Sequence, residues 1–397
     1  MDQNGQTLSP AQQQAFEARL DRFGLSRDTL SAPSIRTGDR PGGFILSSDP
    51  ERSHLPPTMI LVRDVAHLKA LTGIPDEEYE SGRLSDQEIS YPAPPGGQGQ
   101  LPDADTLRAA VAAYVQGNSA KVKDYEPLIN ELRMPMTIGV FAAHDVVVSA
   151  SNPLIFFPGD PTSLVCTSIT VEPGGQIIVQ ETVKLYAQQF TVLDGGDGTT
   201  PTFVVTGQDG VSGAAGGAGQ PGAPGDPLGL ASEDGGTGLP GGAGQAGTYS
   251  PSATLTLGVV TGTVGVVTGG GSGGSGGQGG PGGPGGNAAA GVDPWPGWDG
   301  GIGADGMDPP AGGKGGQGGP GGEGGQGGNG GVVAVFYTSV GSTASWKPVY
   351  TGAGGAGGPG GPPGAPGSGG SPGDYGPGPA GANGGSGVAG VIVIQGR

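Results

Sequence analysis

Residues 270–287 read GGSGGSGGQGGPGGPGGN, and residues 312–329 read GGKGGQGGPGGEGGQGGN. Glycine fills two of every three positions, and a period of three matches neither the 3.6-residue helix repeat nor the 2-residue strand repeat. It matches the polyproline-II helix, which has three residues per turn and no internal hydrogen bonds. The two blocks therefore predict extended helices whose backbone groups need partners in neighbouring segments.

Looser blocks with glycine at every third position run from Gly210 to Gly225, from Gly235 to Gly247 and across residues 352–387. Because glycine lets backbones approach closely, we expect the blocks to associate as a polyglycine-II bundle over residues 209–397. Two alternatives remain open, a flexible low-complexity tail and a collagen triple helix. The shortness of the blocks and the scarcity of proline in two of them count against collagen.

The composition limits the size of any ordinary core. The 397 residues include 91 glycines and 38 prolines, while apolar residues make up 34% and aromatic residues 5%. We therefore expect an apolar core mainly in the N-terminal half. The formal net charge is −18, with acids in excess in both halves, which argues against nucleic acid or an anionic membrane surface as a partner.

Several features bear on where the protein acts. Cys166 is the only cysteine, which excludes an internal disulfide framework. The polar start over residues 1–14 has no signal-peptide pattern, and no run of 18 apolar residues predicts a membrane span. Together with the repetitive blocks, this leads us to expect an extracellular protein, or one on the surface of a virion or other particle, exported without a visible signal peptide.

Residues 1–135 predict a mainly helical region with long loops. Pro10 and the spacing of Phe16, Leu20 and Phe23 predict a helix that ends at Gly24. Further helices are expected over residues 63–72, after a cap at Asp105, and over residues 120–132.

Residues 136–208 predict a β-rich domain, because short β-branched runs alternate with Pro-Gly, Asn-Pro and Asp-Gly turns. The predicted strands are Asp145–Val148, Leu154–Phe157, Leu164–Val171, Gln176–Val179, Thr182–Tyr186, Phe190–Leu193 and Phe203–Thr206. Their close spacing favours a parallel β-solenoid, and a β-sandwich is the alternative. The predicted fold class is thus mixed: helical, then β-rich, then a polyglycine-II bundle with strand and aromatic connections.

The apolar segments between the glycine blocks carry the candidate binding and assembly residues. Aromatic side chains at the bundle ends can stack on sugars or on another protein, or else cap the bundle; they are Trp295, Trp298, Trp346, Tyr350 and Tyr375. Exposed apolar strands can pair between subunits, and the candidates are Val332, Val333, Val335, Phe336, Val391, Ile392, Val393 and Ile394.

No convincing active site emerges, so we expect no enzyme activity. The histidines at 54, 67 and 144 and the thiol of Cys166 fit structural positions in their predicted elements. Residues 300–308 match one copy of a calcium-binding repeat, with Asp305 and Asp308 as candidate ligands. Calcium solenoids need stacked copies to complete their ligand sets, so a chance match is the preferred interpretation; a bound calcium ion is the alternative, and no other cofactor is expected.

The glycine blocks joined by aromatic and β-branched segments, with Gly384–Val388 running into Val391–Ile394, resemble the receptor-binding tail-tip adhesins of T-even-type phages. The resemblance covers residues 210–397 and is compositional. It implies a distal polyglycine-II bundle with specificity loops at its tip. The springtail glycine-rich antifreeze protein has a similar bundle, which would imply a flat ice-facing side.

Our leading hypothesis is a non-enzymatic structural protein, a self-assembling fibre or a fibre component carried on a particle, with itself as partner. The alternative is an adhesin that binds cell-surface glycan or protein through its aromatic loops. An ice-binding protein is disfavoured by the scattered Asp, Glu and Lys residues of the blocks. A solenoid enzyme acting on polysaccharides would need a carboxylate cluster over residues 136–208.

Overall fold

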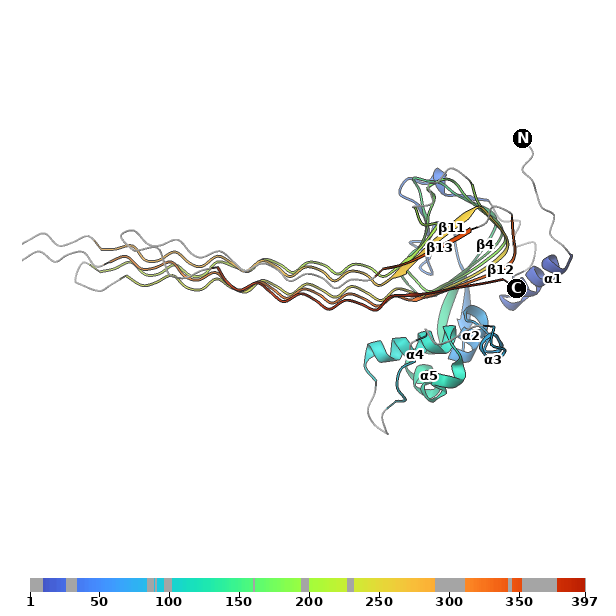
Figure 1. Ribbon diagram of the computed structural model, residues 1–397, viewed down its shortest axis with the longest axis horizontal. Coiled ribbons are helices and arrows are strands. Elements are labelled where there is room, and N and C mark those ends of the chain that lie inside the picture. Colours follow the sequence, from blue (N-terminus) through green and yellow to red (C-terminus); the bar gives the residue numbers. More distant parts are fainter. Residues whose placement is uncertain are drawn as a thin grey trace, which may run out of the picture.

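The computed structural model describes residues 10–25, 34–83, 89, 91–95, 102–159, 161–193, 200–226, 232–289, 311–341, 345–351 and 377–396. Figure 1 shows a head built from two β-sheets and a group of helices, and a long rod that leaves the head on one side. The rod consists of the glycine-rich segments, which run side by side.

The head is an α/β structure with two largely parallel sheets. The large sheet has eight strands in the order β1-β4-β6-β8-β10-β12-β14, with β3 antiparallel to β4. The small sheet has six strands in the order β13-β11-β9-β7-β5-β2, all parallel.

The large-sheet strands are β1 Ile35–Arg36, β3 Thr58–Val62, β4 Met136–Val148, β6 Thr162–Val171, β8 Val183–Val192, β10 Ala253–Thr261, β12 Val332–Val340 and β14 Val391–Gly396. The small-sheet strands are β2 Phe44–Leu46, β5 Leu154–Phe156, β7 Ile177–Val179, β9 Phe203–Thr206, β11 Thr263–Gly269 and β13 Ser345–Thr351. From β4 onward successive strands alternate between the two sheets, so the chain winds as a coil.

The register of the coil places like residues above one another. One column across the large sheet runs Phe141, Leu164, Leu185, Leu255, Val335 and Ile394. These side chains point between the sheets and form a continuous apolar core with Phe156, Phe190 and Phe203. Because a slip of one residue would turn every side chain to the other face, this alternation specifies the register of the strands.

The helices cover the outer face of the large sheet. They are α1 Pro10–Arg22, α2 Val65–Thr72, α3 Glu77–Glu80, α4 Ala104–Gln116 and α5 Glu126–Arg133, with 3-10 turns at Thr37–Asp39 and Ser119–Tyr125. Helices α2, α4 and α5 form a second core with Val165 and Tyr186 of the sheet. This cover explains why Thr162–Cys166 is buried on both faces, as in strands that have neighbours on either side.

The local signals at the helix ends are specific. Asp64 accepts a hydrogen bond from the His67 amide at 2.7 Å, which satisfies a free donor in the first turn of α2. Asp103 does the same for α4 by accepting from Thr106, so the cap lies at Asp103 and not at the expected Asp105. Gly73 and Gly117 end α2 and α4.

The rod is made of five described glycine segments, residues 207–226, 232–250, 270–289, 311–331 and 377–390, which we number first to fifth. The first and second lie between β9 and β10, the third and fourth between β11 and β12, and the fifth leads into β14. They are assigned to neither helix nor strand. The large excursions of the chain thus all start at the small sheet and return to the large one.

Hydrogen bonds join the segments at intervals of three residues. Amides of the first segment donate to the parallel third, as in Gly210 to Ser272 O at 2.7 Å and Gly213 to Ser275 O at 2.8 Å. Amides of the third donate to the antiparallel second, as in Gly277 to Gly242 O at 2.8 Å. One backbone amide of each triplet thus finds its acceptor in a neighbouring segment.

The predicted fold class was wrong. Instead of a mainly helical N-terminal region, a separate β-rich middle and a polyglycine-II helical bundle, the chain is an α/β protein with two parallel sheets and few helices. The N-terminal region supplies β1, β2 and β3, the apolar segments between glycine blocks supply β10 to β13, and the segment after the last block supplies β14. Local pattern could not show that these distant segments belong to the same two sheets, because strand pairing is a long-range property.

Candidate functional site: the junction between the helices and the rod

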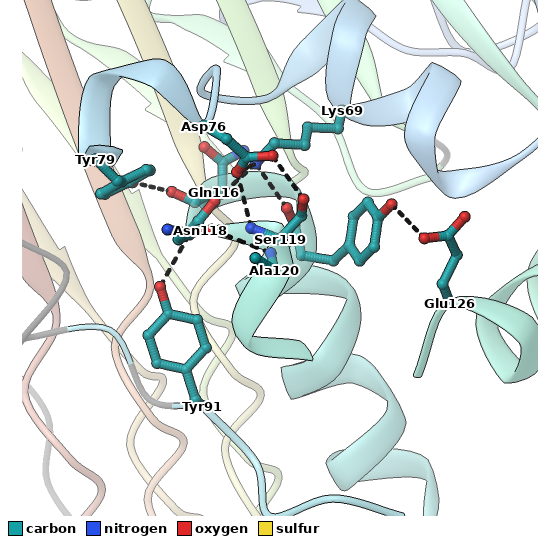
Figure 2. Close-up of polar contacts among 11 residues, drawn as sticks. Lys69, Asp76, Tyr79, Tyr91, Gln116, Asn118, Ser119, Ala120 and Glu126 are labelled. Atoms are coloured by element: carbon teal, nitrogen blue, oxygen red, sulfur yellow. Dashed lines mark hydrogen bonds and ion pairs between the residues drawn. The ribbon is translucent and has the colours of Figure 1, made fainter. Parts of the chain in front are cut away.

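The most connected polar cluster of the described residues lies where the helices meet the base of the rod, and Figure 2 shows it in close-up. At its centre is Lys69 of α2. Its Nζ donates to Tyr114 O at 2.9 Å and to Gly117 O at 2.7 Å, and it lies 3.0 Å from Asp76 Oδ1. An ammonium group has three donors, so these contacts occupy all of them.

Asp76 joins two other parts of the cluster. It accepts the Ser119 amide on Oδ1 at 2.8 Å and the Ser119 hydroxyl on Oδ2 at 2.6 Å. Burial alone would raise the pKa of Asp76, but the Ser119 and Lys69 hydrogen bonds outweigh it and hold the pKa below its usual range. Burial lowers the pKa of Lys69, against the opposing effect of Asp76. The pair thus fastens the end of α4 to the turn that follows.

Tyrosine hydroxyls extend the cluster outward. Tyr114 donates to Glu126 Oε2 at 2.8 Å, and burial together with this bond raises the pKa of Tyr114. The Tyr79 hydroxyl donates to the backbone carbonyl of Gln116, and the backbone amide of Asn118 donates to the Tyr91 hydroxyl at 2.9 Å. The chain between α4 and α5 is therefore held from three sides (Figure 2).

The same loops contact successive strands of the large sheet. Lys184 of β8 donates to Gly73 O at 3.1 Å, and Thr254 of β10 donates to Gln116 Oε1 at 2.9 Å. Ile74, which is 1% exposed, packs with Ala334 and Phe336 of β12. The helices are thereby attached to β8, β10 and β12 next to the points where the glycine segments return.

The chemistry of this cluster is that of a structural junction. The donors of Lys69 are fully used, and Tyr114, with its raised pKa, stays protonated at neutral pH. Among the residues that the structure describes, no group of three or more His, Cys, Asp or Glu side chains is arranged to hold a metal ion. The geometry positions the helices against the coil.

The rod depends on glycine through close approach of neighbouring backbones. A Cβ atom on Gly277 would lie 1.9 Å from Ala214 O, and one on Gly280 would lie 1.8 Å from Gly217 O. Both distances are far inside van der Waals contact, and the obstacle is backbone, which cannot turn aside. Any side chain at these positions would push two segments apart.

The number of glycines per triplet follows the position of the segment in the rod. In the third segment, which bonds to the first, second and fourth, both glycines of most triplets are buried and the third residue is exposed. In the first segment, which flanks the rod, one glycine per triplet faces inward and the other two residues are mostly exposed. Gly-Gly-X thus coincides with burial of the third segment, whereas the second segment, which also has three neighbours, is more exposed and does not keep two glycines in every triplet.

The structure does not bring the predicted aromatic residues together in a described site. Trp295, Trp298 and Tyr375 lie outside the described residues, as do Asp305 and Asp308 of the calcium repeat. Trp346 and Tyr350 belong to β13, and their backbones pair with Val264 and Thr268 of β11. Of the five predicted aromatic binding residues, the structure thus places only Trp346 and Tyr350, on the edge strand β13 of the small sheet.

The predicted assembly residues fall on two adjacent strands with different surroundings. Val332, Val333, Val335 and Phe336 belong to β12, which lies between β10 and β14, and all but Val332 are buried. Val391, Ile392, Val393 and Ile394 belong to β14 at the end of the large sheet and are half-buried. Of the two strands, β14 is the one at an edge.

The single thiol and the exposed histidine of β4 have local partners. Cys166 is buried, burial raises the pKa of its thiol, and its Sγ donates to Tyr186 O at 3.3 Å. His144 Nδ1 lies 2.7 Å from Asp145 Oδ2, and Ser168 donates to the other Asp145 oxygen at 2.5 Å. The serine bonds to the carboxylate and not to the imidazole, so this contact does not activate a nucleophile.

Sequence reasoning missed the junction residues Lys69, Asp76, Gln116 and Ser119. One signal was present: Lys69 lies one turn after Val65 and beside Leu68, on the face of α2 that is buried. A lysine on an apolar helix face requires buried acceptors. Its acceptors come from α4 and from the loop after α2, which no local pattern identifies.

The comparisons with known proteins add no relative. No family model, no curated protein and no solved structure matches this chain. Within the described parts of the chain, no helix has the length and apolar character needed to span a membrane.

Proposed function

We propose that this protein is a non-enzymatic structural component, a subunit of a fibre or of a particle-borne projection. The observation that carries the proposal is the rod itself, a set of cross-bonded glycine segments anchored in two sheets (Figure 1). Three neighbours hold the third segment along its length, so the rod cannot bend without breaking several hydrogen bonds at once. A stiff projection of this kind suits the separation of two surfaces or the building of a fibre.

Strand β14 supports assembly with a second copy. Val391 donates to Gly331 O, which turns the amides of alternate residues toward β12 and those of Ile392 and Ile394 away from it. No other described strand pairs with this outer edge. The strand is apolar over residues 391–394 and uncharged over residues 391–396, whereas edge strands that avoid pairing usually carry charge or proline.

Purified full-length protein imaged by cryo-electron microscopy tests the proposal. We expect regular filaments or defined oligomers joined through the heads. Ile394→Pro removes one outward amide and should abolish assembly, while the matched Ile394→Val variant keeps the amide and should assemble normally. Self-assembly would be contradicted if the natural chain stayed monomeric at all concentrations. Assembly through β14 would be contradicted if Ile394→Pro, with a native circular dichroism spectrum, assembled as well as the natural chain.

An adhesin is the second candidate, and the arrangement at the far end of the rod favours it. Gly225 donates to Asn287 O at 2.9 Å, Gly313 donates to Gly286 O at 2.8 Å, and Ser232 donates to Ala311 O at 2.7 Å. Residues 286–287 and 311–313, which flank the stretch with Trp295 and Trp298 in the sequence, therefore lie together at the far end of the described rod. A partner bound there would be held at a distance from the head.

Attachment to cells or to a glycan panel separates the two candidates. Replacing Trp295 and Trp298 with alanine should abolish attachment if the far end is a receptor-binding tip. Unchanged attachment, or none by the natural chain, would leave the structural role as the function. Filament formation is measured on the same variants, and it should be unaffected because β14 lies at the other end of the rod.

A further inference from the structure

Among the described residues, one two-bond contact occurs three times between parallel glycine segments. Asp209 accepts the Ser272 amide at 2.7 Å, and the next residue, Gly210, donates to Ser272 O at 2.7 Å. Asp234 and Gly235 hold Lys314 in the same way, at 2.7 and 2.8 Å. Asn329 and Gly330 hold Val388 at 2.9 and 2.8 Å. We call each such contact an Asx-Gly clamp.

Two of the clamps lie at the boundary between sheet and rod. Strands β9 and β11 pair Thr206 with Gly269, an offset of 269 − 206 = 63, and the Asp209 clamp has the same offset. Strands β12 and β14 pair Val332 with Val391, an offset of 391 − 332 = 59, which the Asn329 clamp shares. The clamps therefore continue the strand register into the first triplet of the rod.

The glycine segments cannot set this register themselves. In the strands, a shift exchanges buried and exposed side chains, which is costly. In the rod, every third amide makes an equivalent bond, so a slide by one triplet loses bonds only at the ends. The boundary is where such a slide would begin, because three residues would have to loop out between strand and rod.

We propose that Asp209 and Asn329 are register stops that prevent a slide by one triplet at the base of the rod. If residues 207–209 looped out, Asp209 would leave the rod, its clamp would be lost, and Ser212 would take its place opposite Ser272. In the native register Ser212 faces Ser275, with their Oγ atoms 2.9 Å apart. Asp234 is at the far end, where it fastens the second segment to the fourth.

Paired cysteines report the register directly. Ser212→Cys with Ser275→Cys reads the native register, and Ser212→Cys with Ser272→Cys reads the slide; the natural Cys166 is buried and does not compete. The full chain with each cysteine pair is oxidised mildly. Adding Asp209→Ala should raise the yield of the disulfide between residues 212 and 272 about fivefold, in keeping with the loss of one exposed hydrogen bond. Asp209→Asn keeps the acceptor oxygen and should match the natural chain.

The second boundary provides an independent test if Asp209→Ala does not fold. There Asn329→Ala should raise cross-linking of Gln326→Cys with Val388→Cys, the pair that a slide of the fourth segment would bring together. Equal cross-linking in the alanine and parent backgrounds at a boundary that folds would overturn the proposal. So would a rise in Asp209→Asn as large as in Asp209→Ala, because the clamp would then not depend on the acceptor.

Discussion

At the scale of single residues, Lys69 shows how one buried charge organises its surroundings. Its three contacts join the last carbonyls of α4 to the carboxylate of Asp76, and cations stabilise helix C-termini. Asp76 in turn holds both polar groups of Ser119. Removing Lys69 leaves a half-buried carboxylate and two carbonyl groups without this donor, and that penalty exceeds the net value of the ion pair.

Lys69→Met should therefore lower the free energy of unfolding by about 2–4 kcal/mol, because it keeps the length of the side chain but removes the cation from Asp76 and the donor from the Tyr114 and Gly117 carbonyls. Urea denaturation followed by circular dichroism measures the change. Lys123→Met alters an exposed lysine of the neighbouring 3-10 turn and serves as the control, with an expected change below about 0.5 kcal/mol. A similar effect of both substitutions would refute the special role of Lys69.

The lowered pKa of Asp76 predicts a pH dependence of stability. A carboxyl whose pKa is lower in the folded state contributes stability above its ordinary pKa of 3.8 and loses it as the pH falls through the folded value. Asp76→Asn removes this contribution. The natural chain should exceed the variant in stability by a constant amount above about pH 5, and the difference should shrink below pH 3.8. A difference that grows on acidification would contradict the assignment.

At the scale of elements, the glycine segments and the strands obey different packing rules. Strands pack side chains between sheets, as in the column from Phe141 to Ile394. Glycine segments pack backbone on backbone, so their stability comes from hydrogen bonds that offset a high entropic cost of ordering. A single methyl group should therefore matter more in the rod than in most surface segments.

Gly277→Ala should destabilise the rod by roughly 1–3 kcal/mol, the usual cost of overpacking, because its Cβ would overlap Ala214 O. Hydrogen exchange should rise over residues 207–250 while the strands of the head stay protected. Ser275→Ala, at an exposed position of the same segment, should leave exchange nearly unchanged. Equal exchange in the two variants would mean that the segments are not packed as described.

At the scale of the whole molecule, the head sets the arrangement of the rod. All described excursions leave from strands of the small sheet or return to strands of the large sheet, so the two sheets fix the order in which segments lie. The end of α4 and the loop after α2 bond to the first residues of β8 and β10, and β10 follows directly on the second glycine segment. The rod thus extends the coil: the first and third segments are neighbours, as are the strands β9 and β11 that precede them, and the fourth and fifth are neighbours, as are β12 and β14 that follow them.

Small-angle X-ray scattering tests this shape. A compact chain of this length has a radius of gyration of about 21 Å, whereas segments of some 20 extended residues add up to about 70 Å to one side. We expect a value clearly above the compact one, with a distance distribution that has a long tail. A symmetric distribution with a radius near 21 Å in dilute solution would exclude a projecting rod.

Local features of this protein can be predicted from the sequence, whereas the way in which they join follows from packing between distant segments. The period of three, the helices near residues 65–72 and 104–116 and the strand runs over residues 136–206 can be read locally, because turn chemistry and apolar spacing are local properties. Local properties do not show whether residues 253–269 and 332–351 are connections within a glycine bundle or further strands of the two-sheet coil. The outcome depends on pairing with strands far away in the chain; Leu255 of β10, for example, pairs with Leu185 of β8. The junction around Lys69 was settled in the same manner, because its acceptors become neighbours only after α2 and α4 have packed on the sheet.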